Sequence, residues 1–227
     1  MNIKKKIIIF FEILFGIPKS LIFNFKYLPF KQAVKLPIII SRYCSLLELD
    51  GEVIIKSSII KPGMIMLGIG SLGIIDKKFN RSIIELGEKS KLILEGKIRL
   101  GNGFKISSNG EVIIGNNFVM TGDSKIFCAK KIIFGENCLV SWNVLIMDTD
   151  VHVIKFSNSL VNKDEEINIG NNVWVSCNSV ILKGTTIKDN TVIGASSLVN
   201  KKFDMGNIIL GGNPAKIVKK DIEWSIN

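Results

Sequence analysis

The sequence predicts an all-β protein in which short strands wind into a triangular solenoid over residues 51–205. Two observations support this. Apolar residues recur at intervals of six, a period that fits neither an α-helix nor a simple alternating strand. The chain has 227 residues, is 47% hydrophobic and contains 20 glycines, so it can bury a long apolar column and still turn tightly. A basic, aromatic and partly helical segment, residues 1–50, precedes the solenoid, and a basic tail, residues 206–227, follows it.

The N-terminal segment is strongly basic. Residues 1–42 carry eight basic side chains and one acidic one, Glu12, a net charge of +7. Such a segment favours an anionic surface. Its aromatic residues lie among long aliphatic ones, which fits a membrane interface better than nucleic acid. The alternative is an amphipathic helix packed on the protein's own core.

Two other interpretations of this segment are disfavoured. A cleaved secretion signal is unexpected, because Glu12 interrupts the apolar run and no A-x-A-like cleavage site follows. An ordinary membrane-spanning helix is not predicted, because no stretch of 18 apolar residues lacks a charge.

The solenoid repeat begins clearly near residue 85. Apolar triplets spaced by six start at Leu94, Ile114 and Phe134, 20 residues apart, so two extra residues widen one corner of each turn. Before residue 85 the phase blurs, and residues 53–55 and 65–67 are the candidates for the first strands.

The repeat is most regular between residues 169 and 199. The leading apolar positions are Ile169, Val175, Ile181, Ile187, Ile193 and Val199. The fifth positions are small or β-branched, namely Val173, Ser179, Thr185, Thr191 and Ser197. One residue in six is therefore expected to point inward, with the fifth position filling the space beside it. Three such strands complete a coil, and stacked coils bury a continuous column.

A long interruption separates these two stretches. The coil after Phe134 begins 35 residues later, so residues 148–166 form an inserted loop. Long excursions from a regular scaffold are often functional. This loop contains Asp148, Asp150 and His152, the single histidine of the chain. A neutral imidazole can take a proton from an alcohol, and a nearby carboxylate can fix its tautomer. The alternative is a solvated histidine without a catalytic role.

Metal chemistry is not predicted. One histidine excludes a three-histidine site, and the four cysteines have no C-x-x-C spacing. The cysteines, Cys44, Cys128, Cys138 and Cys177, are expected to be reduced apolar fillers, which suits a cytoplasmic location.

The repeat, the loop and the tail together resemble hexapeptide-repeat acyltransferases with a left-handed parallel β-helix. More narrowly, they resemble the maltose, galactoside and Nod-factor O-acetyltransferase branch and its relatives in surface-polysaccharide biosynthesis. The resemblance covers about residues 85–220 and rests on IGNNVWVSCNSVILKGTTIKDNTVIGASSLV, on GGNPAKIVKK and on DTDVH. The left-handed winding is implied by the resemblance alone, because it runs against the right-handed crossover rule.

The resemblance implies acetyl transfer from acetyl-CoA to a hydroxyl group, usually on a sugar. His152 matches the general base, which would activate the acceptor for direct attack on the thioester. The amide of Cys177, or the neighbouring Ser176, would stabilise the oxyanion. A covalent intermediate on Cys177 is not expected. Asp148 and Asp150 would orient His152, hold a sugar hydroxyl, or only shape the loop.

Two further residues are implied on the acceptor side. Trp174 matches an aromatic residue that stacks on the acceptor or on the pantetheine arm of coenzyme A, and its alternative role is an outward residue at a subunit contact. Asn143 would hydrogen-bond the acceptor or serve as a corner residue of the solenoid.

The resemblance also implies a coenzyme A groove. Ala195 matches a small residue beside the pantetheine arm. Asn200 and Lys201 match a Thr-Lys pair, with Asn in place of Thr, which puts a hydroxyl contact in doubt. Lys216 and Lys219 match basic tail positions near the 3′-phosphate. As lysines they lose the bidentate contact that arginine makes. The alternative is a solvated basic tail.

The resemblance implies a homotrimer with active sites between subunits, in which His152 and Trp174 act on opposite sides of one boundary. The expected protein is thus an acetyl-CoA-dependent O-acetyltransferase that modifies a sugar in a surface polysaccharide. Its acceptor would be a saccharide, lipid-linked or free, handled in the cytoplasm or at the inner face of the plasma membrane. The alternatives are an N-acetyltransferase of an amino sugar nucleotide and a non-catalytic β-helix scaffold. The acceptor sugar and the modified position cannot be read from the sequence.

Overall fold

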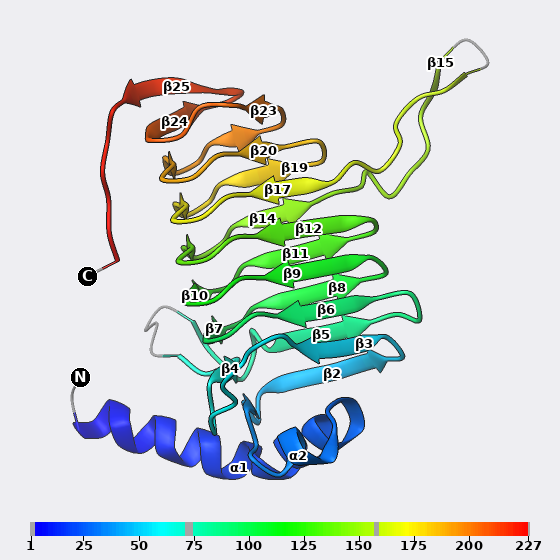
Figure 1. Ribbon diagram of the computed structural model, residues 1–227, viewed down its shortest axis with the longest axis vertical. Coiled ribbons are helices and arrows are strands. Elements are labelled where there is room, and N and C mark those ends of the chain that lie inside the picture. The colour runs from blue at the N-terminus through cyan, green and yellow to red at the C-terminus, as the bar shows by residue number, and fades with distance from the viewer. Residues whose placement is uncertain (1–2, 71–74, 157–158, 227) are drawn as a thin grey trace.

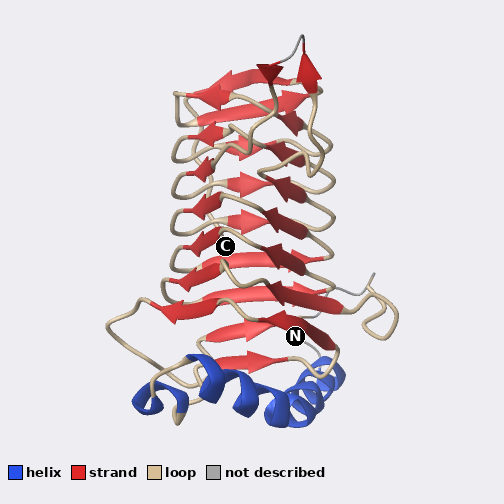
Figure 2. Cartoon of the chain, turned by 90° about the vertical axis from the view of Figure 1, so that its right-hand side faces the viewer, coloured by secondary structure: helices blue, strands red, loops and turns tan. Residues whose placement is uncertain are grey.

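The computed structural model describes residues 3–70, 75–156 and 159–226, and over that range the chain forms a tall triangular prism (Figure 1). Helices α1 (Ile3–Tyr27) and α2 (Phe30–Ala33) lie across its base, and the strands stack above them in parallel layers (Figure 2). The prediction of an all-β, parallel β-helix with a partly helical N-terminal segment is confirmed.

Three sheets form the sides of the prism, here called A, B and C. Sheet A contains β1 (Ile38–Ile40), β4 (Ile65–Leu67), β7 (Ile98–Asn102), β10 (Phe118–Gly122), β13 (Leu139–Val140), β18 (Trp174–Val175), β21 (Val192–Ile193), β24 (Ile208–Gly212) and β25 (Ala215–Lys220). Sheet B contains β2 (Cys44–Leu49), β5 (Ser82–Leu86), β8 (Lys105–Ser108), β11 (Lys125–Cys128), β14 (Leu145–Met147), β19 (Val180–Leu182) and β22 (Leu198–Val199). Sheet C contains β3 (Glu52–Ile55), β6 (Lys91–Leu94), β9 (Glu111–Ile114), β12 (Lys131–Phe134), β17 (Ile167–Ile169), β20 (Thr186–Ile187) and β23 (Lys202–Phe203).

The pairing register reproduces the coil lengths read from the sequence. Glu111 of β9 pairs with Lys131 of β12, a coil of 20 residues. Ile132 pairs with Ile167, which spans the insertion, and Asn168 pairs with Thr186, a coil of 18. The early candidates 53–55 and 65–67 are strands β3 and β4.

The core is the inward column that the repeat predicts. All six leading positions between Ile169 and Val199 are at most 2% exposed. The fifth positions Ser179, Thr185 and Thr191 are completely buried beside them. Each inward isoleucine or valine contributes about 1.5–3 kcal/mol on burial, so the stack itself supplies most of the stability.

The corner between sheets C and A is built from asparagines in the left-handed region. Asn172 (φ 51°) donates its side-chain amide to Asn190 (φ 58°) one coil above, at 2.9 Å. Asn117 and Asn137 form the same contact lower in the stack. Asparagine tolerates positive φ and links each corner to the next, so the corner bends without leaving its amides unpaired.

Helix α1 covers the open edge of β1 with polar side chains. The backbone N–H of Ile40 donates to the Ser20 hydroxyl at 2.9 Å. Asn24 accepts from the Ile38 N–H and donates to the Ile38 carbonyl, at 3.2 and 2.7 Å. Gly16 lies at the closest approach, where an added Cβ would sit 2.1 Å from the Ile40 carbonyl oxygen. The helix thus takes the place of a further strand.

The solenoid is longer than the range 51–205. It starts at β1, residue 38, and continues through β24 to residue 212, since both strands belong to sheet A. At the upper end β25 pairs antiparallel with β24. The tail then runs back down beside the prism to Trp224 (Figure 1).

Helix α1 is long and apolar as well as basic. Among the described residues, one helix is long and apolar enough to cross a membrane by length and composition, the segment Lys6–Tyr27 with a mean hydropathy of 1.8. Length and composition alone do not place a helix in a membrane, so the prediction that this segment does not span one stays a prediction.

Candidate active site

The insertion leaves the prism at the corner between sheets B and C. Strand β14 ends at Met147 and β17 begins at Ile167, and the segment between them projects from the prism as a long arm (Figure 1). Strands β15 (Lys155–Phe156) and β16 (Ser159–Leu160) pair antiparallel near its tip. His152 therefore lies near the root of the arm, close to the solenoid.

Asp148 belongs to the scaffold. Its side chain is completely buried, and its carboxylate accepts the backbone N–H groups of Ala129, Lys130 and Lys131 at 2.7, 2.9 and 2.6 Å. These bonds close the corner of the coil below. The role of Asp148 in holding a sugar hydroxyl is therefore withdrawn, because both oxygens are occupied and no solvent reaches them.

Asp150 anchors the root of the arm. Its carboxylate lies 2.5 Å from the Lys183 ammonium and accepts from the Asn162 side chain at 2.9 Å. The hydrogen bond from Lys183 lowers the pKa of Asp150 below its ordinary value, and Asn162 lowers it further. Lys183 comes from the next coil, so this contact ties the insertion to the body.

The same group fixes the backbone of His152. The His152 N–H donates to the Asp150 carbonyl at 2.6 Å, and the Asn162 side chain donates to the His152 carbonyl at 2.7 Å. Val151 between them has φ 64°, which turns the chain sharply. The imidazole is exposed. Within the described part of the chain, the Asp150 carboxylate bonds to Lys183 and Asn162 and makes no bond to the imidazole, so Asp150 positions His152 through the backbone.

The predicted oxyanion and groove residues lie at a different corner, between sheets A and B. The Cys177 carbonyl accepts the Ser196 N–H at 3.0 Å, which brings Cys177 next to the exposed Ala195. The Ser176 N–H donates to the Ile193 carbonyl at 2.9 Å and is used by the coil. The Cys177 N–H has no acceptor among the residues that the structure describes.

Asn143 stands at the same corner with φ 54°, and its side chain donates to Asn178 at 2.8 Å. This is the stacked corner contact seen elsewhere in the solenoid. It supports the interpretation of Asn143 as a corner residue, and Asn143 is exposed there.

Trp174 lies near the third corner, between sheets C and A. Its indole N–H donates to the Ser141 hydroxyl at 3.1 Å, and its ring lies 5.9 Å from that of Trp224. The Trp224 indole donates to the Asn172 carbonyl at 2.7 Å. The chain's own tail therefore covers Trp174, a contact that the sequence analysis missed because the two tryptophans are far apart in the chain.

Basic residues gather in a pocket at the upper end of the solenoid. The pocket has a volume of about 410 Å³. Three lysines and one acid line it together with apolar side chains, namely Lys201, Lys202, Lys216, Asp204, Phe203, Met205 and Ile217. Two of the predicted cofactor lysines thus meet. Lys202 was missed, although the K-K-F sequence marks it. Asn200 and Lys219 are exposed but do not line this pocket.

One chain alone does not assemble these groups. His152 and Lys183 lie along one edge of sheet B, and Cys177 and Ala195 lie along its other edge. Trp174 belongs to a third corner. The arrangement offers an exposed base, a free backbone donor and a basic pocket, which together suit acyl transfer from a phosphorylated donor. No group of three His, Cys, Asp or Glu side chains that could hold a metal ion occurs in the described ranges.

Comparison with known proteins gives the class of the repeats. Residues 166–201 match the model of the bacterial transferase hexapeptide, six repeats. This segment contains the most regular coils and the Trp174 and Cys177 positions. The resemblance read from the hexapeptides is therefore confirmed over this segment.

The chain is similar to individual acetyltransferases of known substrate. The galactoside O-acetyltransferase of Escherichia coli K12 is 34% identical over 39% of this chain and 44% of its own length. A polysialic acid O-acetyltransferase of Neisseria meningitidis is 29% identical over 41% of this chain and 45% of its own. The chain thus matches less than half the length of these relatives. The solved polysialic-acid-specific acetyltransferase NeuO superposes with a TM-score of 0.57 at 21% identity, over 82% of this chain and 90% of that one, which establishes the shared fold.

Proposed function

We propose that the protein is an acetyl-CoA-dependent O-acetyltransferase that modifies a sugar hydroxyl in a surface polysaccharide. The observation that carries the proposal is the position of His152. It is an exposed imidazole at the root of the longest interruption, in a chain whose adjoining coils are hexapeptide repeats of the bacterial transferase type. The O-acetyltransferase names of the relatives, two of them acting on galactosides and polysialic acid, support the acceptor class.

The chemistry needs one proton transfer and one acyl transfer. The neutral imidazole of His152 takes the proton of the acceptor hydroxyl as its oxygen attacks the thioester carbonyl. The tetrahedral oxyanion then collapses, the C–S bond breaks, and the coenzyme A thiolate takes the proton back from the imidazolium. Asp150 and Lys183 hold the backbone at His152 so that the ring is presented at a fixed place.

The Cys177 amide is the preferred oxyanion donor. The Ser176 N–H is already bonded within the coil, whereas the Cys177 N–H is available. A preorganised backbone donor of this kind contributes roughly 10²–10³ in rate. The Cys177 thiol takes no part, so Cys177→Ala keeps the activity.

The donor would lie with its phosphates at the upper pocket. Lys201, Lys202 and Lys216 supply cations there, and the exposed Ala195 leaves room for a slender arm along the neighbouring corner. We place the reaction in the cytoplasm, which agrees with four free cysteines among the described residues.

We infer that the active site forms between subunits of a homotrimer. His152 and Cys177 stand at opposite edges of sheet B, so one subunit would present its His152 edge to the Cys177 edge of the next. A three-fold ring closes such a head-to-tail contact and makes three equal sites.

The first test removes the base. His152→Ala should lower the acetylation rate by about 10²–10⁴, because the acceptor hydroxyl loses its proton acceptor. Coenzyme A thiol release and the mass of the acetylated glycan are measured together. Val153→Ala, a change at the next residue of the same arm, which is 67% exposed, is the matched control and should keep the rate. A full rate for His152→Ala would overturn the catalytic assignment and leave a binding scaffold.

The second test asks whether the site is shared. His152→Ala and Ala195→Trp should each be inactive, the latter through a blocked groove. Unfolded and refolded together, the two variants should recover about a quarter of the wild-type activity, because random mixing completes that share of sites in a ring. No recovery would mean that each chain completes its own site.

The acceptor screen separates hydroxyl from amine transfer. Polysialic acid, galactosides and amino sugar nucleotides are offered in parallel with acetyl-CoA. An ester that hydroxylamine removes supports O-acetylation, whereas a hydroxylamine-stable amide on an amino sugar would replace the proposed acceptor class.

A further inference from the structure

The face of helix α1 that packs on the solenoid carries polar side chains beside the completely buried Phe23, whereas its outward face is mostly apolar. Its inward face carries Glu12, Ser20 and Asn24, each at most 3% exposed and bonded to the base of the solenoid. Its outward face is apolar in steps of three and four residues. The outward residues, 39–73% exposed, include Ile3, Ile7, Phe10, Leu14, Leu21 and Phe25.

This outward face is continuous and large. Phe30 of α2 is 73% exposed, and its ring lies 6.1 Å from that of Phe25, which extends the stripe past the end of α1. A contiguous apolar surface of this kind is rare on a protein that meets only water. An apolar covering is therefore needed along the whole base.

The charges around the apolar outward face of α1 indicate which kind of partner covers it. Exposed cations border it, namely Lys6, Lys26, Lys31, Lys35 and Arg42. The single acid of residues 1–42, Glu12, is turned inward and paired with Lys77. A second copy of the chain would bring the same positive charge to the contact and be repelled. An anionic lipid surface satisfies both the apolar stripe and its basic border.

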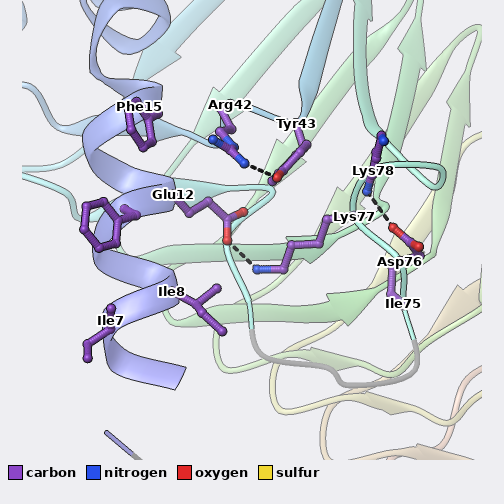
Figure 3. Close-up of a pocket in the computed structure, with 11 residues that line it drawn as sticks. Ile7, Ile8, Glu12, Phe15, Arg42, Tyr43, Ile75, Asp76, Lys77 and Lys78 are labelled. Atoms are coloured by element: carbon purple, nitrogen blue, oxygen red, sulfur yellow. Dashed lines mark hydrogen bonds and ion pairs between the residues drawn. The ribbon is translucent and has the colours of Figure 1, made fainter. Parts of the chain in front are cut away.

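A groove beside the helix adds a place for a headgroup. It has a volume of about 500 Å³ and lies between α1 and residues 75–78 (Figure 3). Arg42 stacks over the rings of Phe15 and Tyr43, at 5.3 and 4.5 Å, and Lys78 faces it across the groove (Figure 3). The lining also contains apolar side chains, the cation of Lys77, and the carboxylates of Glu12 and Asp76. Glu12 is paired with Lys77, so three cations and two acids leave the groove with a net positive charge, which suits a phosphate with an acyl chain attached.

We propose that the base of the solenoid docks on an anionic bilayer, with α1 lying in the interface plane and its outward face buried among the lipids. A transmembrane position is opposed by the inward bonds, since Glu12, Ser20 and Asn24 tie the helix across the end of the prism. A helix held sideways in this way cannot run through a bilayer.

The experiment measures vesicle binding by the full chain, without acetyl donor. Vesicles of phosphatidylcholine with and without phosphatidylglycerol are floated on a density gradient. The wild type should float with the anionic vesicles alone. The double variant Phe10→Gln, Phe25→Gln should lose at least tenfold in binding, because two anchoring rings become polar. Val218→Gln, which changes a residue 67% exposed at the other end, is the matched control and should bind normally.

The charges are tested separately. Lys26→Gln and Lys31→Gln should each weaken binding about fivefold. Arg42→Gln should weaken it further if the groove holds a headgroup. Circular dichroism confirms that each variant is folded, and acetylation of a soluble acceptor is followed in parallel, so a failure of docking is distinguishable from a failure of the enzyme.

Four outcomes would overturn the proposal. The first is no flotation of the wild type, and the second is equal flotation of the double variant. The third is resistance to alkaline carbonate and high salt, which would indicate a spanning helix. The fourth is a change of oligomeric state in the double variant, which would assign the stripe to a contact between copies.

Discussion

The two ends of the solenoid are closed in opposite ways. At the lower end α1 covers the edge of β1 and turns polar groups inward and apolar groups outward. At the upper end β25 covers the edge of β24 with backbone bonds and leaves Lys216, Lys219 and Lys220 exposed. The helix removes the free edge of β1, whereas the added strand moves the free edge of sheet A outward from β24 to β25. The difference shows that the two ends of the solenoid can be covered by different elements, α1 below and β25 above, and that each element can present a different surface to its surroundings.

The largest difference is expected in how much each end contributes to stability. Asn24→Leu should lower the free energy of unfolding by about 2–4 kcal/mol, because the Ile38 N–H and carbonyl lose their partner in a buried place. Urea unfolding followed by circular dichroism measures this. At the upper end Val218 of β25 is 67% exposed, so Val218→Gln should stay within about 0.5 kcal/mol. Equal losses at both ends would contradict the comparison.

A smaller effect should separate the ends in donor binding. Lys201→Gln and Lys216→Gln should each raise the KM for acetyl-CoA about three- to tenfold with kcat little changed, because each removes a charge from the upper pocket. Steady-state kinetics at low and moderate salt measure it. Lys56→Gln, an exposed lysine near the lower end, serves as the matched change and should leave KM as it is. A rise in KM there would show that overall charge, and no particular pocket, binds the donor.

The smallest effect concerns alkaline pH. Burial, helped by the charge of Asp50, raises the pKa of Tyr27 to about 12, and its hydroxyl donates to the Leu49 carbonyl at 2.8 Å. Burial likewise raises the pKa of Cys44 to about 12. A raised pKa means that the folded state disfavours the anion. The stabilisation is thus complete below the ordinary pKa of each group and is lost as pH rises toward 12.

The urea concentration at the midpoint of unfolding should therefore fall between pH 8 and 11. It should fall less for Tyr27→Phe than for the wild type. In the wild type, the tyrosinate absorbance of one tyrosine should appear only at a higher pH than that of an ordinary tyrosine. An identical fall in Tyr27→Phe would show that Tyr27 does not cause the alkaline sensitivity.

Much of the fold could be predicted because the inward positions follow one simple rule. Between Ile169 and Val199 every sixth residue is apolar and buried, so the sequence pattern predicts directly which side chains point inward. The lower coils could not be predicted in the same way. The pairing of β2 with β5 shifts register between Leu46 and Leu49, and the coil from Ile38 to Ile65 is 27 residues long, so no fixed period survives.

The orientation of α1 could not be predicted from hydropathy. The helix is largely apolar on its free side, and Ser20 and Asn24 face the protein because β1 has an unpaired edge there. Only the position of that edge explains why Ser20 and Asn24 are inside.

The site was predicted unevenly for a similar reason. His152 could be selected because it is the single histidine and lies in the largest interruption. Asp148, two residues before Asp150, looked equivalent in sequence. The chain folds it under the corner at residues 129–131, a contact between coils that no local spacing reveals.

The regular stacking of the coils also sets a height. Neighbouring strands lie about 4.8 Å apart, and four steps in sheet B separate β2 at the base from β14 at the root of the arm, a rise of roughly 19 Å. With α1 lying on the lipid surface, the imidazole of His152 would lie well above the lipid headgroups. A saccharide joined directly to its lipid would pass beneath it, and only units farther out along a growing glycan would come within range. The number of coils would then act as a ruler that decides how far from its anchor a polymer is decorated.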